Sequence, residues 1–286
     1  MTDASAEHAR DPGSDRSVDR AGRVANDVAT RLHTAPIEVV GRFAAASNAT
    51  LLVRLTDRDE RSLEQIASEL GREPSVEDLD PGDLAVYKPR RGEAPLWDFP
   101  SGTLHRREIA AHEVSAALGW DLVPTTVMRA EGPFGVGSLQ RFVPHDPSRH
   151  YFTLVEEGDP GVRHQLIAMV LFDLVIDNAD RKGGHVLLSQ ADGPGRVQLV
   201  DHGVSFNVMR KLRTVGWDFA GDAVPPDLRA DLDVFRAALA GELGARLTLL
   251  LSEPEVEVLV ARTVRALEAD VLPEPMGNYP YPWPLL

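Results

Sequence analysis

Cysteine and long apolar runs are both missing from this sequence of 286 residues. A chain without cysteine has no disulfide framework, no thiolate zinc site and no cysteine nucleophile. The longest apolar run covers residues 166–172, whereas a membrane-spanning helix needs about 20 apolar residues. Residues 1–23 are rich in Asp, Arg, Ser and Ala and lack the apolar core of a signal peptide. We therefore expect a cytoplasmic protein with no integral membrane association.

Positive charge is also scarce, since 30 Lys and Arg residues stand against 44 Asp and Glu residues and the net charge is -14. Such a molecule repels duplex nucleic acid and anionic membranes unless a local basic patch compensates. We therefore expect no nucleic-acid partner. The hydrophobic fraction of 43% and the charged fraction of 26% are usual for a globular protein, and the length suffices for two lobes with separate cores.

Strand and helix patterns are unevenly divided along the chain. The first half predicts one long helix at 105–118 and short apolar strands at 37–40, 50–55, 84–87, 122–128 and 136–143. The second half predicts helices at 162–176, 230–240 and 253–269 and two short strands at 185–188 and 197–200. The pattern favours an α+β fold with a disordered or loosely ordered tail (1–34), a strand-rich lobe (35–143) and a helical lobe (144–286).

Four charged positions stand at the ends of these elements. Lys88 ends an apolar strand, and Glu108 lies early in the long helix. Asp180 follows the most apolar helix with His185 five residues on, and Asp201 follows a later strand. Each position alone is typical of a surface lysine, a solvated glutamate or a turn. In this order, however, they match the cation, its carboxylate partner, the nucleophile-orienting residue and the metal ligands of an ATP-dependent phosphotransfer site.

The segments around these positions resemble a known family. Ile-Asp-Asn-Ala-Asp-Arg at 176–181, followed by Val-Asp-His-Gly at 200–203, resembles the phosphatidylinositol 3-/4-kinase superfamily. Residues 107–126 and 135–143 are similar to the type II phosphatidylinositol 4-kinases, and the toxin kinase HipA is a more distant likeness. The resemblance to these kinases covers about residues 36–210. The whole chain resembles an actinobacterial branch of the superfamily. This resemblance implies a kinase-like, two-lobed fold of the atypical, lipid-kinase type.

The resemblance also implies roles for the four positions. Lys88 would contact the phosphates of ATP, and Glu108 would pair with this lysine. Asp180 would orient or deprotonate the acceptor hydroxyl. Asp201 would bind the Mg²⁺ or Mn²⁺ ion that bridges the phosphates, with His185 as a second ligand.

The rest of the nucleotide site is implied on the first hairpin and on the strand before the lobe boundary. Ser47 and Asn48, in the hairpin loop, would lie over the phosphates. Gln140, Phe142 and Val143 would lie on the adenine side, where backbone groups would make the hydrogen bonds.

Three departures from the family pattern keep alternatives open. His185 replaces an asparagine, and a neutral imidazole suits Mn²⁺ better than Mg²⁺. The hairpin loop has only one glycine, Gly41, and His202 stands where an Asp-Phe-Gly motif has phenylalanine. We therefore expect an atypical kinase whose acceptor is a protein, a small molecule or a lipid headgroup. The alternatives are a pseudokinase that binds nucleotide without turnover and an enzyme that transfers AMP to protein.

Overall fold

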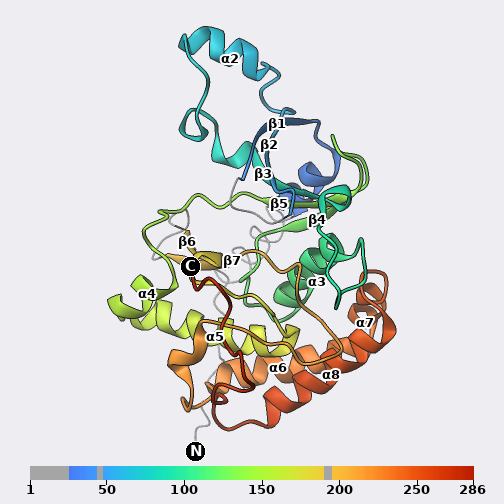
Figure 1. The fold of residues 1–286 in the computed structure, drawn as a ribbon, viewed down its shortest axis with the longest axis vertical. Coiled ribbons are helices and arrows are strands. Elements are labelled where there is room, and N and C mark those ends of the chain that lie inside the picture. The colour runs from blue at the N-terminus through green and yellow to red at the C-terminus, as the bar shows by residue number, and fades with distance from the viewer. Residues whose placement is uncertain (1–25, 44–47, 190–194) are drawn as a thin grey trace, which may run out of the picture.

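The fold described here is that of a computed structural model, which covers residues 26–43, 48–189 and 195–286 (Figure 1). Ser47 lies outside the described residues, so the expectation for this residue stays a prediction. The structure combines helices with a sheet of antiparallel strands, which confirms the α+β class. No helix in the described ranges is both long and apolar enough to cross a membrane.

The first half of the chain builds a five-stranded sheet at the upper end of Figure 1. Its strands are β1 (Ile37–Arg42), β2 (Leu51–Leu55), β3 (Leu84–Pro89), β4 (Thr126–Arg129) and β5 (Gly137–Arg141). They pair antiparallel in the order β1-β2-β3-β5-β4. This order confirms the predicted hairpin of the first two strands, and it places β3, which carries the candidate lysine, in the centre of the sheet.

One face of this sheet is closed by a helix at 26–34. Leu32 of this helix is buried in a cluster with Tyr87 and Leu139 from the two central strands. Full burial of such side chains contributes about 1.5–3 kcal/mol each. Residues 26–34 therefore differ from the loosely ordered tail expected there, because their apolar side chains have a sheet face to cover that the local sequence does not reveal.

The other face of the sheet carries the candidate lysine. Directly opposite residues of an antiparallel pair share a face. Lys88 lies opposite Ser138, and Val86 lies opposite Gln140, so all four side chains stand on one face. The register therefore aligns Gln140 with Lys88 on the same side of the sheet.

Residues 57–83 connect β2 to β3 and extend from the top of the sheet in Figure 1. They contain α2 (Leu63–Leu70) and two 3-10 turns, η1 (Val76–Asp78) and η2 (Pro81–Asp83). A capping box of Ser62 and Gln65 begins α2, and Gly71 in the left-handed region ends it. Ile66 packs against the sheet with Phe142 beside it, so this acidic connection is anchored by an apolar contact.

Helices form most of the remainder of the chain. They are α3 (Leu104–Ala117), α4 (Tyr151–Glu157), α5 (Pro160–Ile176), α6 (Pro226–Leu239), α7 (Glu242–Leu247) and α8 (Glu253–Glu268). α5 is buried on nearly all sides because α8, β7 and the turn η5 (Gly216–Phe219) pack around it. The short helices α4 and α7 are absent from the sequence expectations, since neither is long enough to show a helical period.

A second, two-stranded sheet follows α5 along the chain. It pairs β6 (Val186–Ser189) with β7 (Arg196–Leu199). His185, expected to begin the first of these strands, instead ends the 3-10 turn η4 (Gly183–His185). A further 3-10 turn, η3 (Arg90–Gly92), follows β3. The C-terminal residues form no helix and end beside this second sheet (Figure 1).

Candidate active site

Lys88 stands at the centre of a cluster assembled from three elements. Its ammonium group hydrogen-bonds the Glu108 carboxylate of α3 and lies 2.9 Å from Oδ1 of Asp201, which follows β7. The Lys88 side chain is 19% exposed and that of Glu108 only 3% exposed, whereas the Asp201 side chain is half exposed. The structure thus brings together three of the residues that sequence reasoning selected, although they come from distant parts of the chain.

A buried anchor on the preceding residue determines where Glu108 lies. The Arg107 guanidinium donates to the Ser205 carbonyl at 2.7 Å and pairs with the Glu255 carboxylate of α8. It also lies over the Phe99 ring, 4.9 Å from the centroid. Since a helix moves as a unit, these contacts hold α3 in the orientation that directs Glu108 at Lys88. In the sequence Arg107 belongs to a basic cluster that suggests a solvated face or a phosphate-attracting rim, whereas its side chain is buried.

The three charges of the Lys88 cluster stabilise one another. Burial alone would raise the pKa of Glu108, but the Lys88 charge and a hydrogen bond from His202 lower it to about 2. The Lys88 charge holds the pKa of Asp201 far below its usual range. Burial would lower the pKa of Lys88, but the Asp201 and Glu108 charges raise it above its ordinary value. All three groups are therefore charged at neutral pH.

Asp201 has an unusual backbone conformation of the kind that is common at functional sites. Its φ of 62° is in the left-handed region, which is uncommon for residues other than glycine. The carboxylate Oδ2 lies 3.5 Å from His185 Nε2. Among the described residues no group of three or more His, Cys, Asp or Glu side chains could hold a metal ion on its own. A Mg²⁺ ion typically takes one or two carboxylates and completes its shell with phosphates and water, so Asp201 suits that chemistry.

The His185 ring is arranged to offer a lone pair toward Asp201. Its Nδ1 lies 3.1 Å from the Asp180 carbonyl and 3.5 Å from the Lys182 amide. The shorter contact requires Nδ1 to donate, which leaves Nε2 unprotonated. Burial lowers the pKa of His185 to about 4, against the raising influence of Asp201, so the ring is neutral at pH 7. A neutral imidazole fits the role of second ligand.

Asp180 lies on the loop that follows α5. Its amide donates to Oδ1 of Asn178 at 2.9 Å, which tightens the turn. The Asp180 carboxylate is 32% exposed and lies 3.1 Å from the Lys182 ammonium. Burial raises the pKa of Asp180, and the hydrogen bond from Lys182 opposes that rise. The Asp180 carboxylate is thus accessible. The backbone carbonyl of Asp180 contacts the His185 ring, and that ring contacts Asp201 of the Lys88 cluster.

Behind this loop lies a buried ion pair that sequence reasoning did not find. Arg181 and Asp173 of α5 are both fully buried, and the Arg181 Nη2 and Nε atoms lie 3.1 Å from the carboxylate oxygens. Arg181 Nη1 also donates to the Val200 carbonyl at 2.8 Å. The one visible signal was Asp173 itself, because an acid inside a strongly apolar helix needs a partner.

The same arginine reaches the Lys88 cluster through His202. Arg181 Nη2 lies 2.8 Å from Nε2 of His202. A guanidinium can only donate, so Nε2 accepts and Nδ1 carries the ring proton. Nδ1 lies 3.7 Å from Glu108 Oε2, and the His202 amide donates to the same oxygen at 3.0 Å. The histidine that departs from the Asp-Phe-Gly pattern therefore joins the loop to the glutamate that holds Lys88.

The residues expected to bind adenine lie along β5 and just after it. The Gln140 amide donates to Thr126 Oγ1 at 2.8 Å on the Lys88 face of the sheet. Phe142 is half-buried against the α2 side of the sheet, and Val143 is buried. Asn48 accepts a hydrogen bond from the Ala94 amide at 2.7 Å, so its side chain fastens the hairpin loop to the segment after β3. Their roles in nucleotide binding stay predictions.

Two solved structures with a similar fold are of Golgi casein kinase. A Golgi casein kinase crystal structure with Mn and ADP bound matches with a TM-score of 0.52 and 16% identity, over 86% of this chain and 75% of that chain. A second Golgi casein kinase structure matches with a TM-score of 0.50 at 16% identity, over 86% and 75% of the two chains. The fold is therefore that of an atypical, kinase-like protein, which confirms the predicted fold class.

The chain also has a relative at the level of sequence. It is 36% identical over 279 residues to Protein Rv2133c of Mycobacterium tuberculosis (strain ATCC 25618 / H37Rv), a match that covers 87% of this chain and 91% of that protein. The chain belongs to the family of Protein Rv2133c. No family model matches the sequence.

Proposed function

We propose that this protein transfers the γ-phosphoryl group of ATP to a hydroxyl acceptor. The observation that carries the proposal is the position of Lys88 between the Glu108 and Asp201 carboxylates. An ammonium group has three donors, and two of them are taken by these carboxylates. The third donor, directed by a buried glutamate and next to a half-exposed aspartate, is suited to a phosphate oxygen.

Asp201 would hold the metal in this reaction, with His185 beside it. Mg²⁺ or Mn²⁺ would supply positive charge that neutralises the phosphates of ATP. Mn²⁺ accepts an imidazole ligand more readily than Mg²⁺ does, so the nitrogen of His185 favours Mn²⁺. The Golgi casein kinase with Mn and ADP bound supports this choice by analogy of fold.

The transfer itself would involve Asp180. The acceptor oxygen forms a bond to the γ-phosphorus while the bond from that phosphorus to the β,γ-bridging oxygen breaks. The electron pair of the broken bond remains on the departing ADP. The proton of the acceptor hydroxyl passes to the Asp180 carboxylate and then to solvent. A carboxylate whose pKa is raised by burial is a better proton acceptor than a fully solvated one.

The sequence resemblance to type II phosphatidylinositol 4-kinases and to HipA supports a nucleotide-binding cleft. It does not indicate which acceptor is phosphorylated. Lipid, protein and small-molecule acceptors all present the hydroxyl that this chemistry requires. The net charge of -14 disfavours contact with an anionic membrane surface.

Incubation with ATP labelled at the γ or at the α phosphate tests the proposed function. We expect the γ label, and not the α label, to move to an acceptor from a panel of small hydroxyl compounds, proteins and lipids. Transfer of the α label would identify an AMP transferase. Nucleotide binding by calorimetry without transfer of either label would identify a pseudokinase. Asp233→Asn, an exposed change on α6, serves as the matched control and should transfer label as the parent does.

A further inference from the structure

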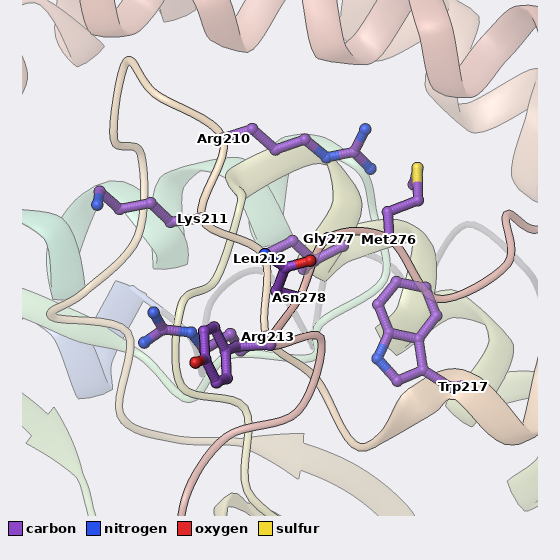
Figure 2. Close-up of a pocket in the computed structure, with 9 residues that line it drawn as sticks. Arg210, Lys211, Leu212, Arg213, Trp217, Met276, Gly277 and Asn278 are labelled. Carbon is purple, nitrogen blue, oxygen red and sulfur yellow. The ribbon is translucent and has the colours of Figure 1, made fainter.

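A hollow of about 260 Å³ opens beside the catalytic loop (Figure 2). Its lining comes from two segments, residues 210–213 together with Trp217 on one side and residues 276–279 of the C-terminal arm on the other. These segments are distant in sequence, and the Lys88 cluster contains none of them.

The hollow adjoins Asp180 through the backbone. The Arg213 amide donates to the Asn178 carbonyl at 2.9 Å, and the Arg181 amide donates to the Arg213 carbonyl at 2.9 Å. Arg213, which lines the hollow, is therefore bonded to the residues on both sides of Asp180. A molecule in the hollow would lie against the loop that carries this carboxylate.

The hollow is positively charged, although the molecule as a whole is acidic. Lys211 is held by Asp98 at 2.9 Å and points to the other side of the segment in Figure 2. Arg210 and Arg213 are exposed, and neither side chain has an ion-pair partner among the residues that the structure describes. Their side chains extend in different directions (Figure 2), so the positive charge is spread across the hollow.

We infer that this hollow binds the phosphoryl acceptor and that the acceptor is a small hydroxyl compound carrying an oxyanion, such as a phosphate ester. The inference rests on the proposed function and adds the chemical class of the acceptor. An arginine fork matches the oxygens of a phosphate or carboxylate group, and an exposed arginine without a carboxylate partner is free to make that contact.

The size and walls of the hollow favour a small acceptor over a polymer. Its volume is slightly below the range of about 300–1,000 Å³ that is usual for small-molecule sites, so a compact acceptor fits and a large one does not. Trp217 and Tyr279 contribute ring surface, and Met276 contributes an apolar side chain, so the carbon skeleton of a compact polyol has surface to pack on. The oxyanion of such a compound would lie at Arg213 while its free hydroxyl reaches Asp180.

The C-terminal arm is fastened where it forms the wall. The Pro280 carbonyl accepts from the Thr214 amide at 3.1 Å and from Trp217 Nε1 at 2.9 Å. Further along, the Leu285 carbonyl accepts from the Gly183 amide at 2.7 Å. Before the hollow, the Gly221 amide donates to the Leu272 carbonyl at 2.9 Å, so the arm is held on both sides of residues 276–279 and the site is built before any acceptor arrives.

Calorimetry with inorganic phosphate tests the site while the cleft is filled with a non-hydrolysable ATP analogue and Mn²⁺, which keeps phosphate out of the γ position. We expect phosphate to bind the parent protein, and Arg213→Gln to weaken that binding about tenfold or more through loss of a charge-assisted hydrogen bond. Arg210→Gln, farther from Asp180, should have a smaller effect. Arg236→Gln on α6 should bind phosphate as the parent does. Equal affinity in the parent and in the Arg210→Gln/Arg213→Gln double variant would overturn the inference.

Competition against bound phosphate identifies the source of the oxyanion. Glycerol 3-phosphate, vesicles containing phosphatidylglycerol and a Glu-rich peptide are each titrated against phosphate, with glycerol as the uncharged control. Displacement by glycerol 3-phosphate at lower concentration than by the vesicles or the peptide supports a small acceptor. The reverse ranking, or equal displacement by glycerol, contradicts it.

The two proposals fail separately in these measurements. If the ATP analogue does not bind, the proposed function has failed, and phosphate titration of the nucleotide-free Arg213→Gln and parent proteins still decides the oxyanion site. If the analogue binds and the phosphate affinity is the same with and without the two arginines, nucleotide binding is supported and only the acceptor assignment is wrong.

Discussion

The two sides of the loop at 177–185 hold charges in opposite ways. On the inner side, Arg181 and Asp173 are fully buried and each is the other's partner. On the outer side, the carboxylates of Asp180 and Asp201 are 32% and 50% exposed. Removing one member of a buried pair leaves an uncompensated charge in the protein interior, whereas an exposed carboxylate can exchange its partner for a ligand. The difference separates residues that hold the loop from residues that can do chemistry.

The buried residues of the inner side also hold the backbone that carries the exposed carboxylates in a fixed position. Arg181 joins the α5 carboxylate, the Val200 carbonyl and the His202 ring in one network, and His202 continues it to Glu108. The loop, the end of β7 and the helix α3 are thereby held relative to one another. Side chains on a fixed backbone meet a substrate in a set geometry, which is the usual condition for efficient catalysis.

Asp201→Asn should have the largest effect on the outer side. Loss of this carboxylate removes the metal ligand, so metal-dependent nucleotide binding and turnover should both fall below detection. Calorimetry with ATP and Mn²⁺ measures the first, and label transfer measures the second. Thermal unfolding without nucleotide should also show some loss of stability, because the Asp201 carboxylate stabilises the Lys88 charge. ATP affinity equal to that of the parent would remove Asp201 from the metal site.

Asp180→Asn should separate turnover from binding. Removing a proton acceptor typically costs about 10²–10⁴ in rate, while ATP affinity should remain close to that of the parent. A γ-label assay and a nucleotide titration on the same protein check both parts. Asp233→Asn provides the control for an exposed aspartate outside the site. A parallel loss of affinity and rate in Asp180→Asn would indicate that this loop only supports the nucleotide.

Asp173→Ala tests the inner side, and its effect should appear in stability. Breaking a buried ion pair at one partner costs about 3–5 kcal/mol. Urea unfolding of the nucleotide-free protein measures this loss. Asp233→Ala, which breaks the exposed pair with Arg236, should change the free energy of unfolding by less than about 1 kcal/mol. Similar losses in the two variants would erase the contrast between the two sides of the loop.

Glu93→Gln should have the smallest effect and should depend on pH. Burial would raise the pKa of Glu93, but hydrogen bonds from the His105 ring and amide lower it below its usual 4.5. As pH falls, the unfolded chain therefore takes up the proton first, so the stabilisation is present at neutral pH and is lost as pH falls below about 4.5. The free energy of urea unfolding should differ between parent and variant by about 1–2 kcal/mol at pH 7, and the difference should shrink as pH falls below about 4.5. A constant difference across this range would contradict the assignment.

The kinase-like class could be predicted because it depends on residues at the ends of elements. Lys88 ends a strand, Asp201 follows one, and Glu108 lies in a long helix, so order along the chain was enough to expect them near one another. The capping box of α8, formed by Ser252 and Glu255, is likewise a pattern of residues close in sequence. Local patterns of this kind depend on neighbours a few residues away, which the sequence displays directly.

The inner network could not be predicted, because burial is a property of the whole fold. Arg181 follows a polar loop and has the sequence context of a surface residue, yet it is fully buried. Its partners Asp173 and His202 come from separate elements, and no spacing rule joins them. The helix at 26–34 was not predicted for a similar reason. Its apolar side chains are buried only because a face of the sheet packs against them, and the local sequence does not show that face.

The anchoring of α3 has a consequence for how the chain folds. Lys88 and Asp201 are separated by 113 positions in sequence, and Arg107 and Glu255 by 148. Closing loops of this length costs chain entropy before any contact compensates, so such contacts form after local hairpins and helices. The cleft is therefore among the last parts of the molecule to assemble. Nucleotide binding, followed in time during refolding, should therefore appear after the local helices and hairpins have formed.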